Sequence, residues 1–489
     1  MATLSGRGGP SWRIVARREL LDIVVSPKFA WTFAVSATLI LLAFWVGARG
    51  FLLEQRRHEA ARAADLRQMR GVTDWLEVSP LVSLPPQPLE TLVAGVANDI
   101  GRNATVEGRG AIATTGSRYA SEPVAALLRV LDLEFVFRVV LGLFAVLLGY
   151  DAVCGERARG TLRLCFAGGL ERASFLGGKI VGALAGLTLP LLVPIGLGAL
   201  LFRLAGVPMA ALDWARLALV LLAGLLYLAT LLALSTWISA LVRQPAHAFF
   251  LALSAWVLLV LVTPRAAVSL AAHRSPVLSR DAIAAERARL QTEIWARDRA
   301  TFRDRVEGIL GPGSIGGHDP QQRMAEVNRF IEEQSSERER RLGELERSLL
   351  ERREAQQKTQ RRLAFGLARV SPAACFTLAA AELAGTSLAL EDELRAQLAR
   401  YQEELGRFQM AKSGGRRSGG GMRLRIAIDD GEPEAPKPID PAELPAFRWQ
   451  SPNLLPALSR SAGDLALLLA FPLVFYAAAF VTFQRYDLR

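Results

Sequence analysis

The residues best placed to do chemistry lie in a short polar segment, residues 152–179, between two long apolar runs. Its charged side chains follow one another closely: Glu156, Arg157, Arg159 and Arg163. Such groups can form charge-assisted contacts with a partner protein, and Gly155 and Gly160 allow tight turns around them. The alternative is that they only anchor the neighbouring apolar runs, through an excess of basic residues on one side of a membrane.

A second polar pair, Glu134 and Arg138, lies near one end of the apolar run 131–151, one helical turn apart. Inside a membrane such residues can mark a substrate path. They can also form a local ion pair near the lipid headgroups, with the Arg138 side chain extending outward. The sequence favours the local pair and leaves the substrate path open.

Several kinds of catalytic or binding motif are missing from the sequence. Gly177–Lys179 (GGK) approaches a phosphate-binding loop, but Ile180 follows it and Ala173 stands where that loop needs glycine. There is no GxSxG, no HExxH and no carboxylate pair with acid–base spacing. Four histidines and three cysteines are scattered, which predicts neither a metal site nor a disulfide framework. We therefore expect no enzyme and no cofactor in this chain.

The composition is typical of an all-α membrane protein. Hydrophobic residues make up 51% of the 489 residues and charged residues 21%, and the two are segregated along the chain. The net charge of +11 comes from 58 Lys and Arg against 47 Asp and Glu. Because the basic excess lies largely beside apolar segments, membrane topology explains it better than nucleic-acid binding does.

Six apolar segments are each near the roughly 20 residues that a bilayer core requires. The predicted spans are residues 29–48, 131–151, 180–202, 217–241, 246–264 and 464–483. The first is too long in its apolar core for a cleaved signal peptide. Basic residues cluster in segment 1–28, loop 152–179 and tail 484–489, which places all three in the cytoplasm. The expected location is the bacterial inner membrane.

Two long segments, residues 49–130 and 265–463, then face the outside. Asp281–Leu310 and Gln321–Phe365 have apolar residues at helical spacing and are separated by a turn at Gly311–Pro320. We expect a coiled-coil-like hairpin in a large helical outer domain. A third helix should cover Leu388–Met410, followed by flexible linkers at residues 412–421 and 432–445.

Residues Val370–Leu390 are moderately apolar and could be read as a seventh span. Glu382, Pro372 and several hydroxyl side chains argue against a span, and a seventh crossing would move the C-terminal arginines outside. We expect an amphipathic helix on the outer membrane surface.

The loop resembles the ABC-2 type permease family, whose pattern here is roughly YD…GERE.GTL..LLS.P..R….GK. The matching residues are Tyr150, Asp151, Gly155, Glu156, Arg157, Gly160, Thr161, Leu162, Arg172, Gly178 and Lys179. The pattern differs at Ala167–Gly169, where the family usually has a small residue and a proline. The segment before span one is similar to the family's N-terminal entry helix. SPAACFTLAAAELAGTS (residues 371–387) and the terminal FQRYDLR are similar to a subgroup with an enlarged outer domain, often associated with maturation of multicopper enzymes.

The resemblance implies a permease that works as a homo- or heterodimer with two copies of a separate ATPase subunit, which binds ATP and Mg²⁺. Segment 152–179 would hold a coupling helix, with Arg163 beside the matched residues. ATP hydrolysis would drive export or a mechanical change in the outer domain, where residues 281–410 could meet a periplasmic partner. No nucleic-acid partner is expected, and membrane lipid is.

Two other classes of function stay open. A membrane-anchored scaffold or assembly protein would use the coiled outer hairpin without transport, and would need no ATPase. The third class, an intramembrane enzyme, is poorly supported, because the sequence has no paired catalytic residues.

Overall fold

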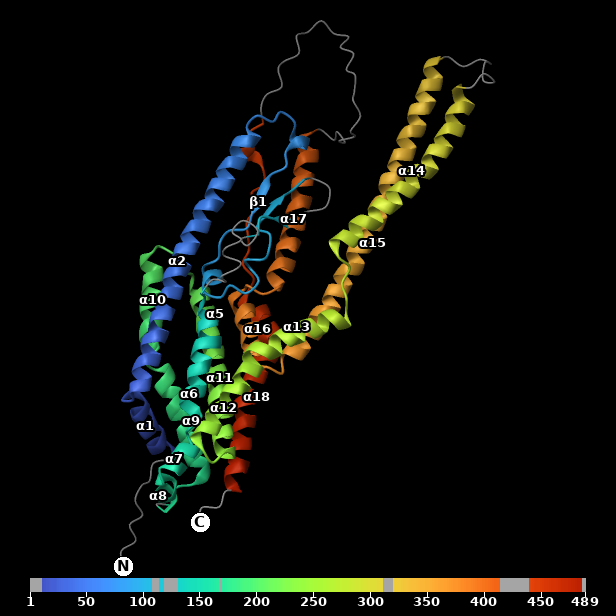
Figure 1. Cartoon of the computed structure of the whole chain (residues 1–489). Coiled ribbons are helices and arrows are strands. Elements are labelled where there is room, and N and C mark those ends of the chain that lie inside the picture. Colours follow the sequence, from blue (N-terminus) through green and yellow to red (C-terminus); the bar gives the residue numbers. More distant parts are fainter. Residues whose placement is uncertain are drawn as a thin grey trace, which may run out of the picture. The chain divides into compact units, whose positions relative to one another are not determined.

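The structure is a computed structural model that describes residues 11–107, 114–117, 131–167, 169–310, 320–413 and 439–485. These residues are almost entirely helical (Figure 1). The chain divides into two compact units, the first formed by residues 1–262 and 371–489 and the second by residues 263–370. The predicted all-α membrane fold is confirmed.

The first unit contains a helical bundle and a small sheet. Its α- and π-helices are α1 (Ser11–Val24), α2 (Pro27–Met69), α5 (Leu133–Phe135), η3 (Val136–Leu141), α6 (Gly142–Gly149), α7 (Cys154–Ala158), α8 (Thr161–Ala167), α9 (Arg172–Thr188), α10 (Leu192–Leu204), α11 (Ala211–Leu241), α12 (Pro245–Trp256), η4 (Val257–Val262), α16 (Pro372–Ala384), α17 (Ala389–Lys412) and α18 (Leu454–Gln484). Its short 3-10 helices and strands are η1 (Trp75–Glu77), η2 (Pro88–Thr91), η6 (Pro441–Glu443), β1 (Leu81–Ser83), β2 (Asn103–Thr105) and β3 (Thr114–Thr115).

Local sequence explains where the bundle helices begin and break. Ser26 caps α2 by accepting a hydrogen bond from the Phe29 amide at 3.2 Å, and Pro27 occupies the first helical position. Pro190 separates α9 from α10, because proline has no amide hydrogen and clashes with the preceding turn. The predicted third span, residues 180–202, is therefore two helices.

Among the described residues, seven helical segments are long and apolar enough to cross a membrane, one more than the six spans predicted. Six of them coincide with the predicted spans. The seventh, Pro372–Lys412, joins α16 to α17 across a break at Gly385, where the backbone is left-handed with φ +77°. Because α16 has 13 residues and rises only ~20 Å, it is shorter than the bilayer core of about 30 Å.

Helix α16 is packed inside the bundle, which corrects the expectation of an amphipathic helix on the membrane surface. Ten of its 13 residues are buried. The Phe376 ring stacks on Tyr227 of α11 at 5.3 Å, and the Ser371 hydroxyl donates to the Leu259 carbonyl of η4. Its many alanines allow neighbouring helices to approach it closely.

The two long polar segments contribute to one small core at the end of the bundle where α11 begins. Strands β1, β2 and β3 form an antiparallel sheet in that order, with Leu81 opposite Thr105. Val82 and Val106 belong to an apolar cluster with Leu394 and Leu398 on one face of α17. The predicted outer domain, residues 265–463, is thus divided, since α16 and α17 belong to the first unit.

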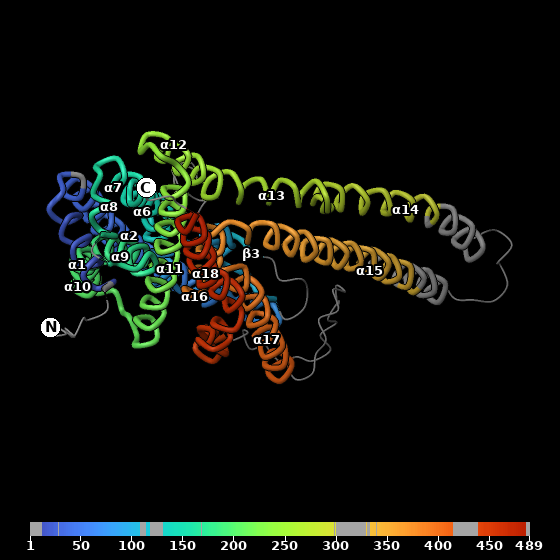
Figure 2. Tube along the Cα trace, turned by 90° about the horizontal axis from the view of Figure 1, so that it is seen from below, coloured from blue at the N-terminus to red at the C-terminus, as the bar shows by residue number. Residues whose placement is uncertain are grey.

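The second unit contains α13 (Thr263–Arg274), α14 (Arg280–Leu310) and α15 (Pro320–Ala368), and α14 and α15 run antiparallel (Figure 2). Arg287 pairs with Glu346 at 3.3 Å, and the Arg338 guanidinium lies 4.2 Å from the centre of the Trp295 ring. The helical hairpin matches the predicted one. Its turn at residues 311–319 and most of the linkers, residues 414–438, lie outside the described residues.

Candidate functional site

Helices α7 and α8 lie at the end of the bundle where α1 and the last turn of α18 are found (Figure 1). Gly160 separates the two short helices and adopts a left-handed conformation with φ +75°, which only glycine takes readily. The Thr161 hydroxyl then donates to the Glu156 carbonyl oxygen at 3.1 Å and also to the Glu156 carboxylate. The predicted turn in this loop is present, and it brings Thr161 back onto α7.

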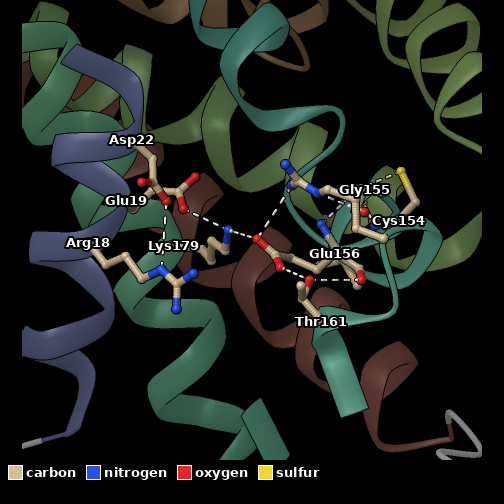
Figure 3. Close-up of polar contacts among 11 residues, drawn as sticks. Arg18, Glu19, Asp22, Cys154, Gly155, Glu156, Thr161 and Lys179 are labelled. Atoms are coloured by element: carbon tan, nitrogen blue, oxygen red, sulfur yellow. Dashed lines mark hydrogen bonds and ion pairs between the residues drawn. The ribbon is translucent and has the colours of Figure 1, made fainter. Parts of the chain in front are cut away.

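Glu156 points toward α9 and joins a row of charges, of which Lys179 is buried and the two carboxylates are half-buried (Figure 3). The Lys179 ammonium of α9 lies 2.8 Å from the Glu156 carboxylate and 2.6 Å from that of Glu19 on α1. The Lys179 side chain is only 9% exposed. The row therefore connects α7, α9 and α1, three elements that are well separated in sequence.

The row holds two carboxylates and one ammonium group, so Lys179 cannot fully compensate both acids. Burial raises the pKa of the Glu19 carboxyl above its ordinary value, and the charge of Lys179 only partly opposes this effect. Removing an ion from water is costly, and the contacts made by Lys179 are what make the arrangement tolerable. The sequence predicted Lys179 as part of the site but missed Glu19.

Three glycines allow α1 to lie close enough for this contact. A Cβ atom at Gly178 would lie 2.6 Å from the Val15 side chain, and one at Gly182 would lie 2.6 Å from the Ala16 carbonyl oxygen. At Gly186 it would lie 3.2 Å from Ile23. The repeat of glycine at every fourth residue of a helix is the pattern that could have indicated this packing from the sequence.

Helix α8 has one buried face and one exposed face. On the buried face, Leu162 is 2% exposed, and the Phe166 ring lies 5.6 Å from both Phe175 of α9 and Phe483 of α18. On the other face Arg163 is exposed, and Leu164 is 73% exposed. An apolar side chain that protrudes beside basic residues is a recurrent feature of protein-binding surfaces.

The remaining predicted residues are distributed between structural and surface positions. Arg172 donates to the carbonyl oxygens of Phe483 at 3.1 Å and Gln484 at 2.6 Å, which fastens the end of α18 to α9. The Tyr150 ring packs edge-on against Phe249, and the Asp151 carbonyl accepts from the Gly155 amide at 2.8 Å. Gly155 is buried, Asp151 and Arg157 are half-buried, and Arg159 is exposed. The sequence match thus combines residues that build the loop with residues that face outward.

A cavity of about 350 Å³ opens between α1 and the loop. Ile14 and Arg18 of α1 line one side, Cys165 of α8 lines the other, and the Lys179 row forms its floor. The cavity lies beside the exposed face of α8.

The Glu134–Arg138 pair is present, with 3.3 Å between carboxylate and guanidinium. It faces α16, because the Thr377 hydroxyl donates to Glu134 at 2.6 Å and accepts from the Arg138 guanidinium at 3.4 Å. The Arg138 side chain is thus half-buried beside α16. A π-helix, η3, spans this pair's arginine, and such bulges are often found at functional positions.

No group of histidine, cysteine, aspartate and glutamate in the described ranges could hold a metal ion. No disulfide joins the cysteines among the described residues, and Cys154 and Cys375 are buried.

Comparison with known proteins shows which family the chain belongs to. The fold and the site define the chain as a multi-pass membrane protein with an ordered, partly helical loop, formed by α7 and α8, at one end of its bundle. A family profile described as "ABC-2 family transporter protein" matches residues 13–488, and the chain belongs to this family. A curated relative, "Probable ABC transporter permease protein NosY" of Stutzerimonas stutzeri, is 39% identical over 127 residues. That match covers 25% of this chain and 45% of the relative, so the chain spans less than half of that protein's length.

Proposed function

We propose that this chain is the membrane permease subunit of an ABC transporter, and that a separate ATPase subunit docks on the exposed face of α7 and α8. The observation that carries the docking surface is Leu164, which is 73% exposed on a helix whose other face is buried. Arg159 and Arg163 flank it. An apolar anchor with a basic rim fits an apolar cleft edged by acidic residues.

The same loop offers a route for transmitting movement. Force applied at Leu164 reaches α9 and α18 through the Phe166, Phe175 and Phe483 rings. It also reaches α1 through Glu156, Lys179 and Glu19. Packed side chains move together because cores are dense. ATP and Mg²⁺ would be bound by the partner, and the movement would drive export or a mechanical change in the domain at the far end of the bundle.

Charge supports the orientation in this proposal. Helices α1, α7 and α8 lie at one end of the bundle (Figure 1). Exposed basic residues of α1, of α8 and of the position directly after α7 are Arg13, Arg17, Arg18, Arg159 and Arg163. By the positive-inside rule, that end faces the cytoplasm, in the bacterial inner membrane. Two ATPase subunits and a second permease, identical or related, would complete the transporter.

The test is co-purification of the full-length chain with its ATPase subunit, followed by an ATPase assay in nanodiscs. We expect the double variant Arg163→Glu/Leu164→Asp to co-purify with less ATPase subunit than the wild type, by a factor of about ten or more. The reason is that loss of an interface anchor and loss of a charged contact each typically cost about 2 kcal/mol or more of binding free energy. The matched control is Arg17→Glu, an exposed arginine on α1 that does not line the cavity.

Two results would decide against this function. Equal ATPase retention by the double variant and the control would place the docking surface elsewhere. A wild-type chain that never co-purifies with an ATPase would favour the scaffold function, with the α14–α15 hairpin as the recruiting element.

A further inference from the structure

A polar cavity of about 370 Å³ lies at the end of the bundle opposite α7 and α8. Its walls come from the start of α11, the end of α16, the start of α17 and the start of α18. The start of α11 is at this end because Ser239, near the end of α11, accepts hydrogen bonds from the amides of Val153 and Cys154 beside α7. The cavity therefore lies where the membrane core meets the polar domain.

One arginine in the cavity wall, Arg216, is buried and not fully hydrogen-bonded. Arg216 is 2% exposed, donates through Nη2 to the Pro452 carbonyl, and leaves its Nε without a hydrogen-bond partner among the described residues. The two other arginines of the wall are matched by acids, Arg460 with Glu382 at 2.9 Å and Arg400 with Glu393 at 3.4 Å. No ion pair joins Arg216 to another described residue, although the charge of Asp213, one turn earlier on α11, acts on it. A buried guanidinium that has no paired carboxylate and an Nε without a hydrogen bond is costly, so an anion in the cavity would be favoured.

The backbone around Arg216 leaves room for its guanidinium. Gly385 ends α16 with φ +77°, and a Cβ atom there would lie 3.0 Å from Arg216 Nη1. Any other residue would strain the turn and crowd the guanidinium. Ser387 and Asn453, which also line the cavity, can donate further hydrogen bonds to an anion.

An apolar strip leads from the cavity along α18. Gly463, Leu467 and Val474 follow Arg460 at helical spacing on the same side of the helix. Gly463 has open space at its Cβ position, and Val474 is 60% exposed. A ligand with a charged head and long apolar chains fits this arrangement better than a small soluble anion does.

We propose that this cavity binds the phosphate of a phospholipid headgroup, with Arg216 as its main partner and the acyl chains along the α18 strip. Arginine suits this role because its planar guanidinium can bind two phosphate oxygens at once. The site is independent of the ATPase-docking surface, which lies at the other end of the bundle.

The experiment measures binding of short-chain phosphatidylglycerol to the delipidated full-length chain in detergent, by native mass spectrometry. We expect one saturable phospholipid per chain, and no comparable binding of diacylglycerol, which has the same chains and no phosphate. Arg216→Gln should weaken binding about tenfold or more, since a hydrogen bond to a charged group is lost. Arg203→Gln, at an exposed arginine ending α10, should bind like the wild type.

Three outcomes would overturn the proposal. Equal binding to wild type and Arg216→Gln would show that Arg216 is not the partner. Equal binding of diacylglycerol would show that no phosphate is recognised, and inorganic phosphate binding as tightly as the lipid would assign the site to a soluble anion.

A second variant guards against misfolding of Arg216→Gln. Ser451→Phe, at an exposed residue of the cavity rim, should fill the cavity while leaving the Arg216–Pro452 hydrogen bond in place. It should lose phospholipid binding at an unchanged melting temperature. Undiminished binding by this variant would also contradict the proposal.

Discussion

Lys179 is the residue on which the arrangement of the cytoplasmic loop depends most. It is the buried cation between two half-buried carboxylates, at 2.6 Å from Glu19 and 2.8 Å from Glu156. Removing one partner from a buried ion pair leaves an uncompensated charge, which usually destabilises a protein more than loss of the whole pair. The two carboxylates are not equivalent, because that of Glu156 also lies 3.5 Å from the Arg159 guanidinium.

We predict that Lys179→Met destabilises the chain by about 3–5 kcal/mol, because Glu19 then lacks its cation and Glu156 keeps only the exposed Arg159 guanidinium at 3.5 Å. Glu19→Gln should cost less than about 1 kcal/mol, since Glu156 still pairs with Lys179 and an amide oxygen can accept a hydrogen bond. Thermal unfolding in detergent, followed by fluorescence, measures the difference. Equal melting temperatures for the two variants would mean that Lys179 does not hold the row together.

Comparing Glu19→Gln with the wild type at several pH values tests the buried charge itself. Because burial raises the pKa of Glu19 in the folded chain, ionisation of this group costs stability. That cost is absent below its ordinary pKa of about 4.3, and grows as the pH rises through the raised value. The wild type should therefore lose melting temperature relative to Glu19→Gln over this interval. A constant difference would indicate that Glu19 is not buried as described.

Residue types alone could not separate the inward from the outward charges of the loop. The sequence proposed Glu156 and Arg157 as contacts for a partner, yet Glu156 turns inward to Lys179. The reason is that its partner, Lys179, comes from α9, 23 residues further along the chain. Leu164 was missed because an exposed leucine cannot be recognised before the buried face of α8 is known.

At the scale of elements, the spacing of glycines decides whether α1 can dock on α9. A Cβ atom at Gly182 would lie 2.6 Å from a backbone oxygen of α1, which cannot move aside as a flexible side chain could. Gly196 of α10 offers the opposite case, since nothing lies within 4 Å of its Cβ position. The two positions therefore form a matched pair of glycines in neighbouring helices.

We predict that Gly182→Leu releases α1 from α9, whereas Gly196→Leu leaves it in place. Overpacking typically costs about 1–3 kcal/mol, so local opening of α1 should become roughly tenfold more frequent or greater. Limited trypsin digestion at Arg17 and Arg18, both exposed on α1, reports that opening. Equal cleavage rates in the two variants would show that α1 does not need the close approach.

Apolar runs predicted the spans well, because each long run has nowhere to be buried except in lipid or in the bundle. Apolar runs did not predict the position of α16, a helix of only 13 residues that is buried by neighbours from α11, α18 and η4. The small sheet was also missed, since strands of two or three residues carry no periodic pattern and depend on α17 for their core.

For the molecule as a whole, contacts at one end of the bundle constrain the number of membrane crossings. Glu19 of α1 and Phe483 of α18 both contact α9 near its beginning, through Lys179 and Arg172. The chain must then cross the membrane an even number of times between them. Six spans satisfy this condition with α16 as a short internal helix, and a seventh crossing by α16 would violate it.

A cysteine-accessibility experiment tests both the crossing number and the orientation. Arg159→Cys reports the α7–α8 end, and Arg407→Cys, whose native arginine side chain is 81% exposed on α17, reports the opposite end. Cys165, the partly exposed native thiol among the described residues, is first replaced by serine. Gly414 and Glu434, in the predicted outer linkers, and Arg489, in the predicted cytoplasmic tail, lie outside the described residues, so Arg159 and Arg407 are used instead.

We predict that a membrane-impermeant maleimide labels Arg407→Cys in intact spheroplasts and Arg159→Cys only in inverted vesicles. The physical reason is that the basic cluster around α1, α7 and α8 favours retention on the cytoplasmic side. Labelling after detergent treatment provides the control that each thiol is reactive. The reverse pattern would invert the orientation and remove the proposed docking surface from the cytoplasm, where ATP is. Labelling of both positions from the same side would contradict the even-numbered bundle, because α7 and α17 would then lie at one face of the membrane.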